Sequence, residues 1–299
     1  MPVPMTSAEP VGEFEWSRRA VINAVSVLAE HAGSLTLVGG HAVVLRTADV
    51  LAPIESTGDG DLGVTPGLVA SSPSLDALLT GAGYELRTAS RPGQWGRGPY
   101  TDRAGRRTYR EKVDLLAGKA LSGSAGKQRR GVPALRDRHG KMCVGSATGL
   151  ELSAYDRSVM TVPDLADPAT SVRVNVAGVA ALICAKSFKI GERLVDTDRD
   201  RLRDKDVGDL WRLMASTSAT EVAELFATYE LHEAIGESVQ TGRGWLALLL
   251  ADASIRERAY RAFGVSLARA TIDDVFDAWR DIFAATTEPL PRPKGLTAS

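Results

Sequence analysis

Residues 35–64 read LTLVGGHAVVLRTADVLAPIESTGDGDLGV. The apolar run 35–38 predicts a short strand, and Gly39-Gly40 predicts a turn into a helix. After a loop, residues 59–64 predict a second strand. The order is therefore strand, glycine turn, helix and a second strand that carries two aspartates.

Three aspartates are expected to meet on this predicted sheet. Asp59 and Asp61 are two residues apart, and side chains two apart on a strand share a face. Asp114 lies in the alternating run KVDLL (112–116), which predicts a further strand. Carboxylate oxygens are the ligands that hard divalent cations prefer, so the three aspartates predict a metal site. The alternative for Asp114 is a solvated aspartate on an edge strand.

The glycine pair fits two interpretations. Without side chains, Gly39 and Gly40 let the backbone come close to a triphosphate, and the N-terminus of the following helix offers it N–H groups. Double glycines also make plain turns, and Asp59-Gly-Asp61 alone fits a turn as well. The two motifs together, at this spacing, favour a functional site.

Apolar spacing predicts most of the remaining elements. Helical spacing marks residues 13–32, and strands are predicted at 108–116, 159–162 and 171–176. Residues 91–106 are rich in Gly, Pro and Arg and predict a mobile loop. The helices predicted in the remainder of the chain are 177–192, 203–216, 219–229, 232–251, 254–263 and 271–285.

Strands followed by helices are typical of an α+β protein. We expect an N-terminal domain over 12–176, in which helices flank a mixed β-sheet, and a C-terminal helical domain over 177–286. Residues 1–11 and 287–299 are expected to be flexible tails. A chain of 299 residues is long enough for two such domains.

The composition is that of an ordinary globular protein, with 44% hydrophobic and 24% charged residues. No apolar stretch approaches the ~20 residues of a membrane helix, so we expect no membrane partner. The N-terminal sequence has neither a basic start nor an apolar core, which argues against a signal peptide. Two cysteines and four scattered histidines lack the spacing of a zinc site. We therefore expect a cytoplasmic protein.

Charge is concentrated in one segment. Residues 87–141 contain fifteen Lys or Arg against four Asp or Glu, a local balance of +11, in a chain whose net charge is −1. A concentrated basic segment in a nearly neutral protein is typical of a polyanion partner. The alternative is a solvated basic loop without a partner.

These motifs resemble those of the nucleotidyltransferase superfamily, whose fold is shared with DNA polymerase beta. Its pattern is Gly-Gly or Gly-Ser, a spacer, Asp-x-Asp, and a later Asp on another strand. Gly39-Gly40, Asp59-x-Asp61 and Asp114 match it. In the middle of the Asp-x-Asp motif the family usually has an apolar residue. A glycine in that place predicts a less rigid strand.

A narrower resemblance is to the AbiEii-type toxins of type IV toxin–antitoxin systems, including the MenT-like toxins that act on tRNA. In those proteins a Ser or Thr stands two residues before the first Asp, as Thr57 does here. A helical lysine and a following arginine match Lys186 and Arg193, and Asp-x-x-Asp-Leu matches the run from Asp206. This resemblance covers residues 35–64 and 177–215. The segment 90–150 carries no family motif.

The resemblance implies a role for each matched residue. Asp59, Asp61 and Asp114 would bind Mg²⁺ or Mn²⁺, and Asp114 has the alternative of helping to deprotonate the attacking hydroxyl. Gly39 and Gly40 would contact the nucleotide, and Thr57 would hydrogen-bond its phosphate or position the acceptor. Lys186 would bind the phosphates of an NTP, with Lys189 as its rival. Asp206 would orient Lys186 or the nucleotide, with Asp209 as the competing choice.

The resemblance implies transfer of a nucleotide from an NTP to an RNA acceptor, the tRNA 3′ end being the favoured one, by two-metal phosphoryl transfer. The basic segment 87–141 would bind the RNA, and a toxin of this type would have a cognate antitoxin. One alternative is an enzyme of the same fold that modifies a small molecule, such as an aminoglycoside, or a protein hydroxyl. Another is an inactive module that binds nucleotide or RNA.

Overall fold

The structure is a computed structural model that describes residues 10, 12–54, 57–101, 105, 108–123, 131–196 and 202–284. Contacts divide the chain into two units that interleave along the sequence. The first contains residues 1–42, 56–147 and 157–177, and the second contains 43–55, 148–156 and 178–299.

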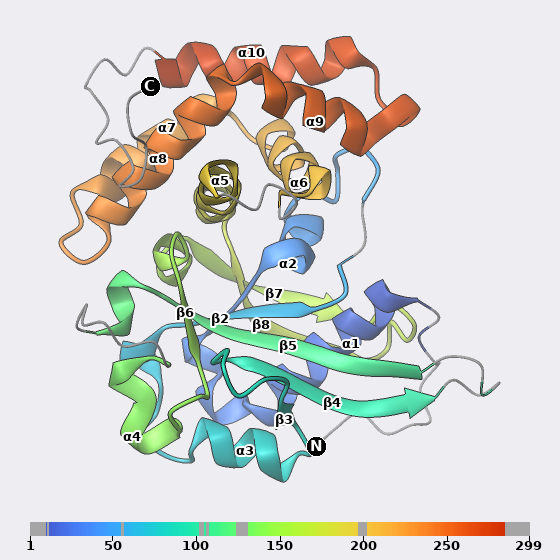
Figure 1. Cartoon of the computed structure of the whole chain (residues 1–299), viewed down its shortest axis with the longest axis vertical. Helices are drawn as coiled ribbons and strands as arrows, with labels where there is room; N and C mark the ends of the chain where they lie inside the picture. The colour runs from blue at the N-terminus through green and yellow to red at the C-terminus, as the bar shows by residue number, and fades with distance from the viewer. Residues whose placement is uncertain are drawn as a thin grey trace. The chain divides into compact units, whose positions relative to one another are not determined.

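A mixed β-sheet forms the centre of the first unit (Figure 1). The strand order is β3-β4-β5-β2-β1-β8-β7, and β6 pairs with β5 off this path. β1 and β2 are antiparallel, whereas β2 pairs with β5, and β1 with β8, in parallel. The strands are β1 (Leu35–Val38), β2 (Gly60–Val64), β3 (Glu85–Leu86), β4 (Gln94–Thr101), β5 (Thr108–Gly118), β6 (Gly145–Ala147), β7 (Arg157–Pro163) and β8 (Ser171–Ala177).

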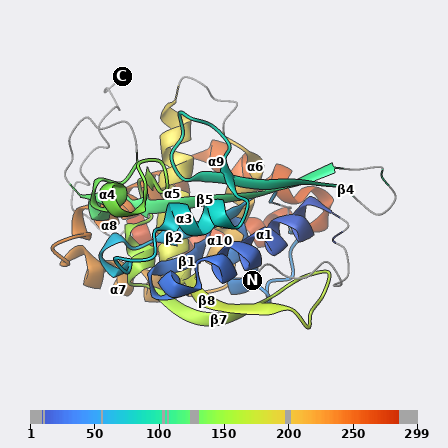
Figure 2. The ribbon, with the colours of Figure 1, turned by 90° about the horizontal axis from the view of Figure 1, so that it is seen from below.

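Helix α1 (Glu13–Val27) covers one face of this sheet, in front of the strands in Figure 2. Trp16 stacks on Tyr109, and the Asn23 amide donates to Glu111 Oε1 at 2.9 Å. Tyr109 and Glu111 have odd numbers on β5, so the alternation of the strand turns Asp114 to the opposite face. The unit also contains the short helices α3 (Leu75–Gly81) and α4 (Arg136–His139).

The mobile loop predicted at 91–106 is wrong for its central part, which is strand β4. Composition misled the prediction because strand β4 accepts glycines and a proline at particular positions. The register of β4 on β5 shifts between Arg97 and Tyr100, and Gly98 and Pro99 lie in that irregularity. A proline cannot donate to a ladder, so a bulge is one of the few strand positions that accept it. Residues 102–104, 106 and 107 lie outside the described residues.

The second unit is helical. Its main helices are α5 (Val179–Val195), α6 (Asp204–Ala215), α7 (Ala219–Glu230), α8 (Gly236–Ala251), α9 (Ala253–Phe263) and α10 (Arg269–Ala284). Each lies within a few residues of a predicted helix. Helix α2 (Gly39–Arg46) begins in the first unit and ends in the second.

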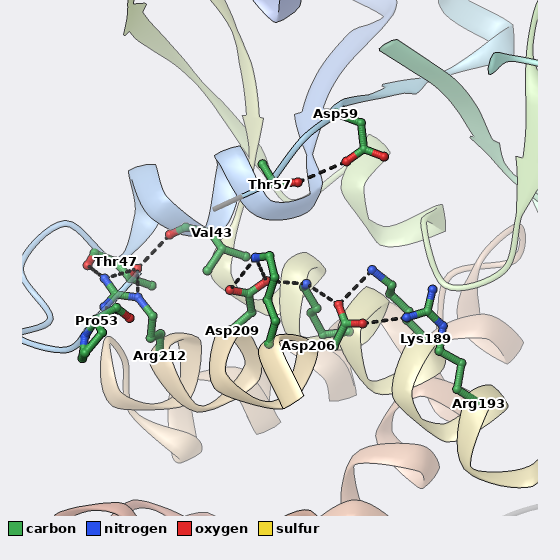
Figure 3. A network of polar contacts seen from close by, with 12 residues as sticks. Val43, Thr47, Pro53, Thr57, Asp59, Lys189, Arg193, Asp206, Asp209 and Arg212 are labelled. Carbon is green, nitrogen blue, oxygen red and sulfur yellow. Dashed lines mark hydrogen bonds and ion pairs between the residues drawn. The ribbon is translucent and has the colours of Figure 1, made fainter. Parts of the chain in front are cut away.

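Two inserted segments belong to the helical unit through specific bonds. Arg212 on α6 donates to the Thr47 carbonyl at 2.7 Å (Figure 3). It also donates to the Ala52 carbonyl. Asp156 Oδ2 accepts the N–H of Ala181 at 2.8 Å in the first turn of α5. The segments 43–55 and 148–156 are therefore structural parts of the helical unit, although they lie far from it in sequence.

The expected α+β class, with a mixed sheet flanked by helices, is confirmed. The boundary expected between 12–176 and 177–286, as a division into domains, stays a prediction. The expected tails at 1–11 and 287–299 lie outside the described residues, apart from Pro10. Among the described residues, no helix is long and apolar enough to cross a membrane.

Candidate functional site

Three carboxylates converge on the sheet face opposite α1. Asp61 on β2 pairs in register with Asp114 on β5, and Asp59 immediately precedes β2. One carboxylate oxygen from each of the three lies within 4.8 Å of the others. Negative charges this close repel one another, and a divalent cation with oxygen ligands would relieve that repulsion. The three residues therefore have the donor type and the spacing to hold Mg²⁺ or Mn²⁺.

Thr57 positions the first of these carboxylates. Its hydroxyl donates to Asp59 Oδ1 at 3.1 Å, and the two side chains point toward each other in Figure 3. The Thr57 carbonyl accepts from the Ser17 hydroxyl of α1 at 2.7 Å. Helix α1 thus fixes the loop that carries Thr57 and Asp59. The role of Ser17 was missed because nothing in the sequence links it to residue 57.

Gly39 and Gly40 make room for the acidic site. Gly39 has a φ of +65°, and a Cβ there would lie 2.0 Å from Asp61 Oδ2. A Cβ on Gly40 would lie 3.1 Å from Thr57 Cβ. The glycine pair therefore lets the start of α2 pass directly beside the carboxylates. This is a steric reason for the motif, and contact with a nucleotide stays a prediction.

Packing against α1 explains the glycine at position 60, which the sequence alone did not reveal. The residue is buried, and a Cβ there would lie 2.4 Å from Cγ2 of Val21 on α1. An apolar side chain, usual in the resembled family, would collide with this fully buried valine. The glycine lets α1 pack closely beneath the two aspartates that flank it in sequence.

Asp114 has two further partners from neighbouring strands. Arg87 Nη2 donates to its Oδ1, and Gln94 Nε2 donates to its Oδ2 at 3.2 Å. Burial raises the pKa of Asp114 above its ordinary value, and the charge of Asp59 adds to this, while Arg87 and Gln94 oppose it. Neither partner was predicted, because their placement follows from the strand order β3-β4-β5.

The second unit contains a separate polar cluster around Lys186 on α5. Its Nζ lies 2.6 Å from Asp209 Oδ2 and 3.1 Å from Asp206 Oδ1, both on α6. Burial alone would lower the pKa of Lys186, but Asp209 and Asp206 outweigh burial and raise it. Burial would likewise raise the pKa of Asp206, but Lys186 and Lys189 lower it below its ordinary value. Lys186 and Asp206 are therefore both charged at neutral pH.

Further cations surround the same two carboxylates. Lys189 Nζ lies 2.8 Å from Asp206 Oδ1, and Arg193 Nη1 lies 2.7 Å from Asp206 Oδ2 (Figure 3). Lys205 Nζ lies 3.1 Å from Asp209 Oδ2. With Lys186, four cations meet two carboxylates, an excess of two positive charges. An arrangement of this kind can attract an anion.

The structure thus sorts the predicted site residues into two groups. Gly39, Gly40 and Thr57 lie with the three aspartates in the sheet unit, whereas Lys186 and Asp206 lie together in the helical unit. The choice between the two α6 carboxylates as partner of the lysine is not exclusive, since both bind it. The lysine side chain is only 7% exposed, against 44% for that of Lys189.

Comparison with known proteins found no matching family model, no similar curated protein and no similar solved structure.

Proposed function

We propose that the protein is a metal-dependent nucleotidyltransferase that transfers a nucleotide from an NTP to an RNA hydroxyl, with the tRNA 3′ end as the favoured acceptor. The convergence of Asp59, Asp61 and Asp114 carries this proposal. The resemblance of the surrounding motifs to those of AbiEii-type toxins supports it. An enzyme that consumes NTP and modifies tRNA would act in the cytoplasm.

In the proposed reaction the acceptor hydroxyl oxygen bonds to the α-phosphorus of the NTP, and the bond to the pyrophosphate breaks. A divalent cation would neutralise charge on the phosphates and on the departing pyrophosphate. Asp59 and Asp61 would hold it, and Thr57 would keep Asp59 oriented. Asp114 would serve as third ligand or accept the hydroxyl proton. Positioning and charge neutralisation would supply most of the rate.

The cationic cluster of the second unit would bind phosphate oxygens of the NTP. Lys186 is enclosed by Asp206 and Asp209, so its main contribution would be to order the cluster. Lys189 and Arg193 have side chains that are 44% and 24% exposed, and both are better placed to contact a phosphate. Lys189, the alternative to Lys186, would therefore make the direct contact with phosphate.

The basic segment 87–141 supports an RNA acceptor, because some of its cations lie on the same face of the sheet as Asp114. Arg97 binds Glu111 at 2.9 Å, so one pair of opposite charges cancels on the α1 side of the sheet. Lys112 and Arg110 alternate with Glu111 and share the face of Asp114. No ion pair or hydrogen bond joins the Lys112 side chain to another described residue. The Arg110 side chain is 47% exposed and lies 3.7 Å from Glu85 Oε2. A phosphate backbone leading toward the carboxylates would meet these two cations.

The test is to incubate the protein with each labelled NTP, Mg²⁺ and total cellular RNA, and to look for labelled RNA. We expect label on tRNA-sized species, and its loss in Asp61→Asn and in Lys189→Ala. Asp137→Asn, which removes an exposed carboxylate of the sheet unit, is the matched control and should keep full activity. Circular dichroism of each variant excludes misfolding as the cause of lost label.

The same experiment separates the alternatives. Label on protein, or on an added aminoglycoside, with none on RNA would replace the RNA acceptor and keep the reaction type. NTP binding without any transfer would favour an inactive binding module. Growth arrest on expression, relieved by a co-expressed neighbouring gene, would support the toxin assignment and its antitoxin.

A further inference from the structure

Arg87 reaches the acidic site from the edge of the sheet at which β3 lies. It follows strand β3, and its backbone N–H donates to the Gln94 carbonyl at 2.8 Å. Gln94 is paired in register with Asp114, and Asp114 with Asp61. These four residues form one row across neighbouring strands, at the level of the carboxylates.

A glycine on β4 leaves space for the Arg87 side chain. Gly96 on β4 has no Cβ, and one added there would lie 3.1 Å from Arg87 Cγ and 3.2 Å from the Glu111 carbonyl. The aliphatic stem of Arg87 therefore passes close over Gly96. Its side chain is 21% exposed, and its buried Nε has no hydrogen-bond partner among the described residues. The guanidinium thus has unused donor capacity beside the carboxylates.

Both carboxylate oxygens of Asp114 already accept a hydrogen bond. Its Oδ1 accepts from Arg87 and its Oδ2 accepts from Gln94. A divalent cation shared with Asp59 and Asp61 would need one of these oxygens. Because the guanidinium and the cation are both positive, they also repel each other at this distance. Arg87 and the cation therefore compete for the same carboxylate.

We propose that Arg87 is an exchangeable counter-ion: a divalent cation displaces it from Asp114, and the released guanidinium turns to the phosphates of the bound NTP. This inference rests on the proposed function, because it assumes the metal site and the nucleotide. The planar guanidinium suits this exchange, because its fork of N–H donors matches carboxylate and phosphate oxygens alike. A lysine would match only the charge.

The test measures Mn²⁺ binding to the full-length protein by calorimetry. Arg87→Gln should bind Mn²⁺ about tenfold more tightly than wild type, because a competing charge-assisted hydrogen bond is gone. Arg91→Gln removes the same charge from an exposed side chain four residues away and should leave the dissociation constant unchanged. In an Asp114→Asn background, Arg87→Gln should have no further effect, which assigns the competition to this pair.

Kinetics supply the second half of the test. At saturating metal, Arg87→Gln should raise the KM for NTP, since the released guanidinium is missing, and Arg91→Gln should not. If Arg87→Gln binds Mn²⁺ no more tightly than Arg91→Gln, the exchange is refuted, while binding that depends on Asp61 would leave the metal site standing. If neither the wild type nor Arg87→Gln binds Mn²⁺, the exchange and the proposed function both fail.

Discussion

Replacing Gly39 by alanine should damage the acidic site through sterics alone. Gly39 has a φ of +65°, and alanine in this left-handed region costs about 1–2 kcal/mol of folding free energy. The new Cβ would also lie 2.0 Å from Asp61 Oδ2, so the carboxylate must turn away. Displacing a ligand by changing the residue that supports it typically weakens metal binding about 10- to 100-fold.

The comparison that isolates this effect is Gly58→Ala. A Cβ on Gly58 would find its nearest neighbour, Glu13 Oε2, at 3.6 Å, which is ordinary contact. Urea unfolding should show a loss for Gly39→Ala alone, and calorimetry with Mn²⁺ should show weakened binding for the same variant. Wild-type Mn²⁺ affinity in a folded Gly39→Ala protein would refute the steric account of the glycine pair.

Three further predictions follow from the packing, the ion pairs and the basic face. Gly60→Ala should lower the free energy of unfolding by about 1–3 kcal/mol through overpacking, and adding Val21→Ala should recover part of the loss; additive losses would contradict the contact. The pKa of Asp206 is held below its ordinary value, so the unfolded chain takes up a proton first as the solution is acidified. Stability should therefore fall as pH drops from about 5 toward 2, and urea unfolding of Asp206→Asn should show a shallower fall over that range. Lys112→Ala should weaken RNA binding and reduce the slope of log K against log salt concentration by about 0.7. Lys141 is an exposed lysine outside β5, so Lys141→Ala should change neither quantity.

The sequence was sufficient to predict the central part of the sheet. The run 59–64 placed Asp61 on a strand, and alternation placed Asp114 on another. The connection through Gly39-Gly40 indicated that a helix follows β1. Both patterns are local, so they can be recognised without knowledge of the strand order. The helices after residue 177 were predicted for the same reason, because amphipathic spacing is a property of each helix separately.

The missed features depend on which strands become neighbours. Arg87 and Gln94 reach Asp114 only because β4 lies between β3 and β5, and nothing in the spacing of these residues encodes that order. Gly60 was interpreted as a weakness of the strand, because the position of α1, and hence of Val21, was unknown. Strand β4 was missed because its glycines and proline are tolerated at a bulge that only the paired strand reveals.

The interleaving of the two units limits how the protein can be divided for experiments. A stop codon after residue 177 would leave Thr47 and Ala52 without the Arg212 side chain that binds their carbonyls, and Asp156 without the α5 backbone that it caps. A fragment made this way would expose two orphaned segments and invite aggregation. To divide the protein, short linkers would have to replace both segments in the sheet half. The helical half, expressed as a second polypeptide, would then have to include both segments itself.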